Sequence, residues 1–117
     1  MSKEDIEEFC KKFYDALDAG DAETASALFP DGTEINLWDG KVFTTKSEFR
    51  AWFRELYARS DHAKREITHL EVDGNFATIE VVLNASVDGE QKTVSLKHFF
   101  QFEGDRLVRV DVKINPL

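Results

Sequence analysis

Cysteine and basic residues are scarce in this chain, and each shortage excludes a class of structure or partner. The single cysteine, Cys10, rules out an internal disulfide, and its place in an apolar helical pattern favours a small buried hydrophobe over a reactive thiol. With 15 basic residues against 23 acidic ones, the formal charge of −8 repels nucleic-acid phosphates and anionic lipids. No apolar run is long enough to cross a bilayer, and the amino terminus lacks an apolar signal segment. We therefore expect a cytoplasmic protein that binds neither nucleic acid nor membrane.

The length of the chain predicts one domain over residues 1–117, because no internal repeat, low-complexity tract or linker interrupts the sequence. Ser2 and Asp5 resemble a capping box at the start of a first helix. Apolar residues then recur at helical spacing as far as Leu17, and Gly20 offers a stop. The domain therefore opens with a helix.

Short elements follow this helix. Asp21 can cap a second helix, and Pro30 ends it. Residues 33–38 alternate between apolar and polar side chains, as a strand does, and residues 42–44 can return from it as a hairpin arm. A helical hairpin and a short strand pair are thus predicted for this part of the chain.

A third helix is predicted after the capping box formed by Thr45 and Glu48. Its apolar face is a wide and mostly aromatic stripe, which consists of Phe49, Trp52, Phe53, Leu56 and Tyr57. Such a stripe is more often core than a ligand platform. We therefore take it at most as the lining of a pocket.

Four strands make up the rest of the chain, at residues 65–72, 76–87, 92–102 and 106–114, and turn dipeptides rich in Asp and Gly separate them. They predict an antiparallel meander with one apolar face, which in the last strand consists of Val108, Val110, Val112 and Ile114. The helices must cover this face. The fold class is therefore α+β.

His98 interrupts the apolar face of the third of these strands, between Leu96 and Phe100. Burying an imidazole without a hydrogen-bond partner costs about 1–3 kcal/mol, so a partner or trapped water is expected. One interpretation is a neutral core histidine with a structural hydrogen bond. The other is a polar group facing a pocket, either as a ligand donor or as a general acid/base, with Tyr14 or Tyr57 as a second donor.

The order of these elements resembles the nuclear transport factor 2-like superfamily, as do the segments "LDAGDAETASALFPDG" and "FEGDRLVRV". That superfamily includes ketosteroid isomerases, SnoaL-type polyketide cyclases, scytalone dehydratase and non-catalytic binding modules. The resemblance covers essentially the whole chain. It implies a cystatin-like roll, in which a curved, mostly antiparallel sheet wraps three N-terminal helices into a cone with an apolar pocket. It also implies a homodimer through the outer sheet face.

The resemblance does not carry over the ketosteroid isomerase site, in which a carboxylate base works with a tyrosine and a protonated aspartic acid. It aligns the family's helix-one tyrosine with Phe13, the base with Leu37 and the supporting helix-three tyrosine with Phe53. The remaining oxyanion donor aligns with His98. Tyr14 lies one residue beyond Phe13, about 100° around the helix. Steroid isomerisation by that mechanism is therefore not expected.

Other candidate groups give weaker signals. His62, His69 and His98 lie on separate elements without short ligand spacing, and no phosphate-binding loop or nucleophile elbow is present, so we expect no metal or cofactor. Glu34 or Asp39 could replace the missing base near the pocket mouth. The segment "WDGK" that contains Asp39 is, however, typical of an ordinary turn.

Two functions are compatible with this sequence, and whether the protein is an enzyme stays open. In the first, an apolar pocket takes a small hydrophobic carbonyl compound, and His98 with Tyr14 supplies isomerase, cyclase or lyase chemistry. In the second, the domain binds a small molecule without chemistry or serves as a dimerising protein-interaction module. The residues expected to line the pocket are Phe13, Leu37, Trp38, Phe53, Tyr57, Leu96 and Phe100.

Overall fold

Three helices cover one side of a single sheet. The computed structural model describes residues 2–115. Its helices are α1 (Lys3–Asp18), α2 (Ala22–Ala27) and α3 (Lys46–Ala58). Capping boxes start α1 and α3, because the side chains of Ser2 and Thr45 accept hydrogen bonds from the backbone N–H groups of Asp5 and Glu48. The three helices predicted from capping and periodicity are confirmed.

The strands form one six-stranded sheet in the order β2-β1-β6-β5-β4-β3. Their bounds are β1 (Glu34–Asn36), β2 (Val42–Phe43), β3 (Ser60–Asp73), β4 (Phe76–Val87), β5 (Glu90–Glu103) and β6 (Arg106–Asn115). From β3 to β6 the strands run as an antiparallel meander, as predicted. The exception to antiparallel pairing is β1, which lies parallel to β6.

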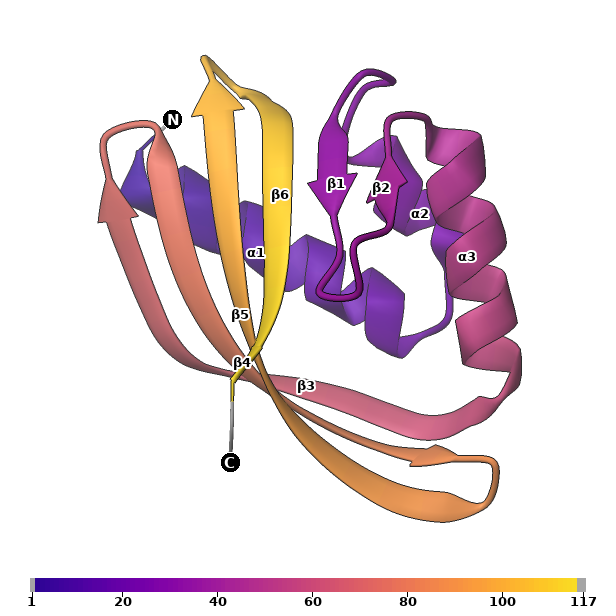
Figure 1. The fold of residues 1–117 in the computed structure, drawn as a ribbon. Helices are drawn as coiled ribbons and strands as arrows, with labels where there is room; N and C mark the ends of the chain where they lie inside the picture. Colours follow the sequence, from indigo (N-terminus) through magenta and orange to yellow (C-terminus); the bar gives the residue numbers. More distant parts are fainter. Residues whose placement is uncertain (1, 116–117) are drawn as a thin grey trace.

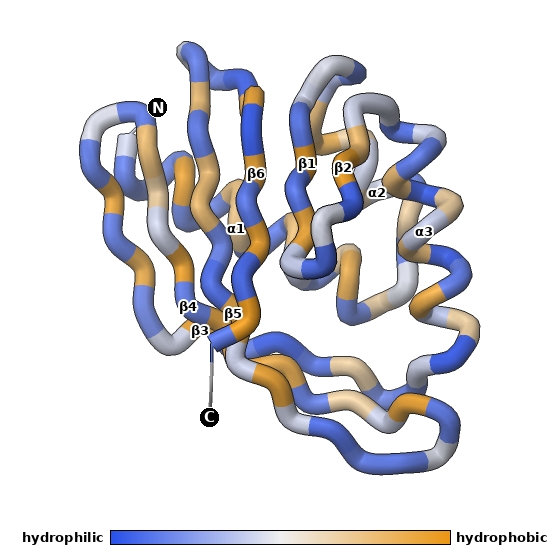
Figure 2. Tube along the Cα trace, viewed as in Figure 1, coloured by the Kyte–Doolittle hydropathy of each residue, from blue (hydrophilic) through white to orange (hydrophobic). Residues whose placement is uncertain are grey.

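The sheet is strongly curved and does not close, and the helices lie in its hollow (Figure 1). The ring of Phe13 on α1 meets that of Phe100 on β5, with centroids 6.2 Å apart. Trp52 on α3 packs against Phe43 on β2 at 5.6 Å. Hydrophobic and hydrophilic residues alternate along the strands (Figure 2), which leaves one face for the helices. The predicted α+β class with a curved sheet is confirmed.

Two irregularities were not predicted. β3 starts at Ser60, well before the predicted residue 65, because its first part pairs with the far end of β4 through a register shift. In β6 a second shift lets Leu107 face Phe102. Leu107 is therefore buried, whereas Val108, which was expected on the inner face, is only partly buried. Pairing partners set both features, and residue type along one strand does not reveal them.

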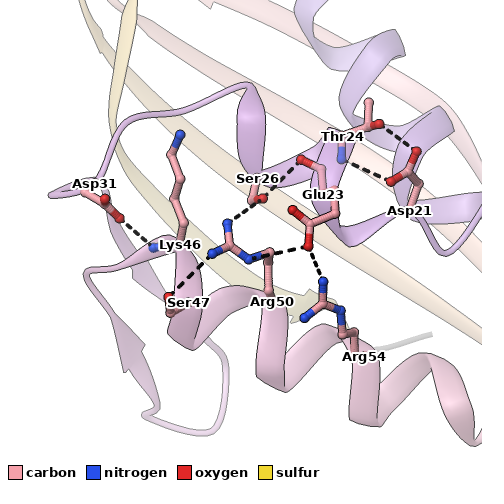
Figure 3. A network of polar contacts seen from close by, with 9 residues as sticks. All are labelled: Asp21, Glu23, Thr24, Ser26, Asp31, Lys46, Ser47, Arg50 and Arg54. Carbon is pink, nitrogen blue, oxygen red and sulfur yellow. Dashed lines mark hydrogen bonds and ion pairs between the residues drawn. The ribbon is translucent and has the colours of Figure 1, made fainter.

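A polar network joins α2 to α3 (Figure 3). Ser26, which is 1% exposed, accepts a hydrogen bond from Arg50 and donates one to the carbonyl of Glu23. The Glu23 carboxylate also contacts Arg50 and Arg54. Exposed ion pairs of this kind contribute little stability, but the buried hydroxyl requires its partners. The network therefore holds α3 in one orientation, with its aromatic stripe toward the sheet.

Two further expectations concern single features of the surface and core. Cys10 is fully buried, and burial raises the pKa of its thiol to about 12, so it behaves as a small hydrophobe. The outer sheet face is polar apart from a few partly exposed apolar residues such as Phe99. Dimerisation through that face stays a prediction.

No helix within residues 2–115 combines the length and hydropathy needed to cross a membrane.

In the turn between α1 and α2, Gly20 packs tightly against the ring of Tyr57 on α3. Gly20 has a φ of +71°, and a Cβ added to it would overlap the ring of Tyr57. The Tyr57 hydroxyl in turn donates to the Asp18 carbonyl at 3.4 Å. This position therefore needs glycine for two reasons, backbone conformation and space.

Replacing Gly20 tests this contact. Gly20→Ala should lower the free energy of unfolding by about 3 kcal/mol, because positive-φ strain adds to the displacement of a packed ring. The matched control is Gly104→Ala, with a φ of +61° and nothing within 4 Å of the added methyl group. It should lose only about 1 kcal/mol. Urea denaturation followed by tryptophan fluorescence measures both, and equal losses would show that the Tyr57 ring moves freely.

Candidate functional site

A cavity of about 240 Å³ remains between the helices and the concave side of the sheet. Its wall is mostly apolar and takes side chains from α1, α3 and the strands β1, β3, β4, β5 and β6. The sequence led us to expect seven residues on the wall of a pocket. Six of them lie on this wall, namely Phe13, Leu37, Trp38, Phe53, Tyr57 and Leu96. Trp38 is 45% exposed, so this part of the wall reaches the solvent.

Phe100, the remaining residue named as lining, lies in the packed core instead. Its exposed fraction is 1%, and its ring is 6.0 Å from the imidazole of His98 in a stacked arrangement. The rings of Phe9 and Phe13 cover its other sides. α1 crosses β5 at this level and fills the space that a ligand would otherwise reach. Phe100 therefore supports His98 and does not touch the cavity.

Tyr14 and His98 form a buried hydrogen bond from α1 to β5. The Tyr14 Oη and His98 Nδ1 atoms lie 2.7 Å apart, and the two rings stack at 5.5 Å. His98 lines the cavity, whereas Tyr14 lies behind it and does not reach the wall. The tautomer of His98 decides which of the two groups donates, and we assign Tyr14 as the donor because its hydroxyl has no other hydrogen-bond partner within residues 2–115. A neutral imidazole then carries its own proton on Nε2.

The charge state of this pair follows from its burial. Burial lowers the pKa of His98 to about 3, and the positive charge of Arg65 lowers it in the same direction. Burial also raises the pKa of Tyr14 well above its usual value. Both groups are therefore uncharged at neutral pH.

The second ring nitrogen of His98 is accessible. Among residues 2–115, the one fully buried side-chain nitrogen or oxygen without a hydrogen-bond partner is Asn36 Nδ2. Nε2 of His98 has no partner within these residues and is not fully buried, and His98 lines the cavity.

Arg65 is a second polar group on the cavity wall, and it was not among the residues predicted to lie there. Its side chain is 8% exposed, and Nη1 lies 2.7 Å from Oδ1 of Asp18. The backbone N–H of Arg65 donates to the other carboxylate oxygen at 3.0 Å. The one signal in the sequence is that Arg65 shares strand parity with Ile67. The contact with Asp18 at the end of α1 depends on tertiary structure.

The other candidates lie away from the wall. Asp39 accepts hydrogen bonds from the backbone N–H and Nζ of Lys41, which agrees with the turn interpretation and lowers the pKa of its carboxyl. Glu34 is near Arg109 on the outer side. His62 and His69 are exposed and lie beside acidic neighbours on β3. Across residues 2–115 no three His, Cys, Asp or Glu side chains gather as a metal site would require.

Burial of neutral His98 should make stability depend on pH. An unfolded histidine binds a proton near pH 6.5, whereas the folded imidazole stays neutral down to about pH 3. Between these values the unfolded state binds the extra proton, so stability is present above pH 6.5 and is lost as the pH falls. We expect the free energy of unfolding to fall by roughly 1.4 kcal/mol per pH unit between about pH 6 and about pH 5.

Urea denaturation at closely spaced pH values measures this slope, and carboxylates stay mostly ionised in the window. His98→Gln should flatten it, whatever its effect on overall stability. The control His69→Gln removes a histidine whose side chain is 52% exposed, and it should leave the slope unchanged. The same slope in wild type and His98→Gln would show that His98 does not titrate on unfolding as argued.

Solved structures with the same fold are numerous but distant in sequence. A hypothetical protein with a ketosteroid isomerase-like fold from Catenulispora acidiphila, in complex with trimethylamine, has a TM-score of 0.82 at 17% identity, over 90% of this chain and 83% of that chain. A proposed SnoaL-like polyketide cyclase from a Jannaschia species has a TM-score of 0.85 at 10% identity, over 98% and 90%. An LEH-like epoxide hydrolase from M. tuberculosis has 0.77 at 14%, over 92% and 80%. At these identities the likeness shows the fold alone.

No curated protein matches this chain by sequence. The model of the SnoaL-like domain family, in contrast, matches residues 10–110. This match includes α2, α3 and all strands from β1 to β5, together with most of α1 and half of β6. Because the match spans most of the chain, the chain belongs to the SnoaL-like domain family.

Proposed function

We propose that this domain binds a small, mostly apolar molecule with a carbonyl oxygen or a similar acceptor, and that His98 Nε2–H donates a hydrogen bond to it. The observation that carries the proposal is the Tyr14–His98 contact at 2.7 Å, which supports an imidazole proton on the cavity side. The wall around this donor is apolar. Cavities that combine an apolar wall with a few placed polar groups are typical small-molecule sites.

The same observation favours a donor over a general base. A general base needs a free lone pair directed at the substrate and a pKa near the working pH. The cavity-facing nitrogen of His98 carries a proton in this arrangement, and burial lowers the imidazole pKa to about 3. Among the lining residues within 2–115 there is no Asp or Glu that could accept a proton instead. Binding therefore has more support than proton abstraction.

Cyclase-type catalysis is the second candidate. Proposed polyketide cyclases from Xanthomonas campestris and Shewanella denitrificans share this fold, with TM-scores of 0.81 and 0.82. A neutral imidazole N–H that donates to a carbonyl would make its carbon more electrophilic, which a ring closure requires. A proton acceptor for such a reaction would come from the substrate or from water.

Two ligands of nearly equal shape test the binding proposal. 2-Acetylnaphthalene carries a carbonyl oxygen, whereas 2-ethylnaphthalene has no acceptor. We expect the ketone to bind about fivefold to tenfold more tightly at pH 7, as one hydrogen bond of about 1 kcal/mol predicts. Tryptophan fluorescence titration measures both affinities, because Trp38 and Trp52 lie on the wall.

Variants of the hydrogen-bonded pair make this test specific. His98→Phe should remove the preference for the ketone, and Tyr14→Phe should reduce it, because Nδ1 then loses the donor that keeps the proton on Nε2. Tyr57→Phe is the matched control, since it removes a phenol hydroxyl from the wall and leaves His98 untouched. Equal binding of the two ligands to wild type, or an unchanged preference in His98→Phe, would refute the donor role.

A further inference from the structure

We propose that the ligand of this cavity is an acid, and that Arg65 and His98 together hold its carboxylate. The inference rests on the proposed function, because it assigns a chemical class to the molecule bound there. Arg65 is the one charged residue among the lining residues of the described chain. Its side chain is 8% exposed, so its charge lies in the wall and not at the protein surface.

The guanidinium of Arg65 uses only part of its hydrogen-bonding capacity within the protein. Nη1 binds Oδ1 of Asp18, while Oδ2 of the same carboxylate accepts from the backbone N–H of Arg65. The pair is therefore not the fork-to-fork contact that a guanidinium and a carboxylate form when both oxygens bind the side chain. Nε and Nη2 of Arg65 have no partner within residues 2–115, and neither is fully buried. One edge of the fork is left for a ligand.

α1 contacts both Arg65 and His98, and both of these residues line the cavity. Tyr14 holds His98 and Asp18 holds Arg65, and the two α1 residues are four positions apart. Residues at this spacing lie on one face of a helix, about 5–6 Å apart at Cβ. The charge of Arg65 acts on both groups: it adds to burial in lowering the pKa of His98, and it opposes the rise that burial causes in the pKa of Tyr14. Two donors whose partners share one helix face suit one acceptor group with two oxygens.

The one carboxylate beside the guanidinium offsets its charge only in part. Asp18 is its one carboxylate partner in the described residues, and the Asp18 side chain is 22% exposed, so water weakens its attraction. A neutral carbonyl would satisfy His98 and leave the Arg65 edge to water. A carboxylate would accept from both donors through charge-assisted hydrogen bonds, with its apolar body against the aromatic rings of α3.

The test adds a third naphthalene, 2-naphthoate, to the ketone and the ethyl compound. At pH 7 we expect 2-naphthoate to bind about tenfold more tightly than 2-acetylnaphthalene, because charged hydrogen bonds are roughly twice as strong as neutral ones. Isothermal titration calorimetry at fixed ionic strength measures both. Equal or weaker binding of the acid, with the ketone still preferred over 2-ethylnaphthalene, would overturn this inference and leave the proposed function standing. Failure of every naphthalene to bind would overturn both.

Arg65 variants separate charge from shape. Arg65→Met combined with Asp18→Asn removes the ion pair without leaving a lone charge, and it should abolish the advantage of the acid while changing ketone affinity less than about twofold. Arg65→Lys keeps the charge but not the fork, so it should retain only part of the advantage, and it serves if the double variant fails to fold. Arg106→Met, which alters an exposed arginine outside the cavity wall, is the control. A full advantage in both Arg65 variants would contradict the inference.

Discussion

The packing of α1 across the concave face of the sheet is the contact on which the rest of this structure depends. Aromatic rings form its centre: Phe9 meets Phe100 and Phe102 edge-on, and Phe13 reaches Phe100. Aromatic pairs in this geometry add to the stabilisation that burial provides. α1 fills the hollow of the sheet at this level. Beyond α1, no helix packs closely against the sheet, and the cavity lies in that space.

The same helix carries the polar contacts of the site. Tyr14 and Asp18 lie one turn apart on α1. Tyr14 is hydrogen-bonded to His98 of β5, and Asp18 is paired with Arg65 of β3. A buried histidine or arginine without partners would cost about 1–5 kcal/mol of stability. With these partners both groups are tolerated in an otherwise apolar wall. Core packing and site chemistry thus share one element, so a change in α1 affects both.

The chemistry of this wall differs from the carboxylate-based site of ketosteroid isomerases. The resemblance aligns its base and tyrosines with Leu37, Phe13 and Phe53, and these three residues lie on the wall as apolar groups. What is left is a neutral imidazole and one partly satisfied guanidinium. The proposed hydrogen-bond donor rests on these two groups. Membership of the SnoaL-like domain family specifies the fold, whereas the side chains on the cavity wall govern what it can bind.

Local sequence determined the elements of this protein, because caps, turns and periodicity act over a few residues. Ser2 with Asp5 and Thr45 with Glu48 set the starts of α1 and α3, and strand parity placed His98 on the inner face. Tertiary structure decided which side chains reach the cavity. Strand parity alone cannot show that α1 covers Phe100, that a bulge turns Leu107 inward, or that Arg65 meets Asp18 across 47 positions. Each of these depends on two segments far apart in the chain, and only the folded packing brings such segments together.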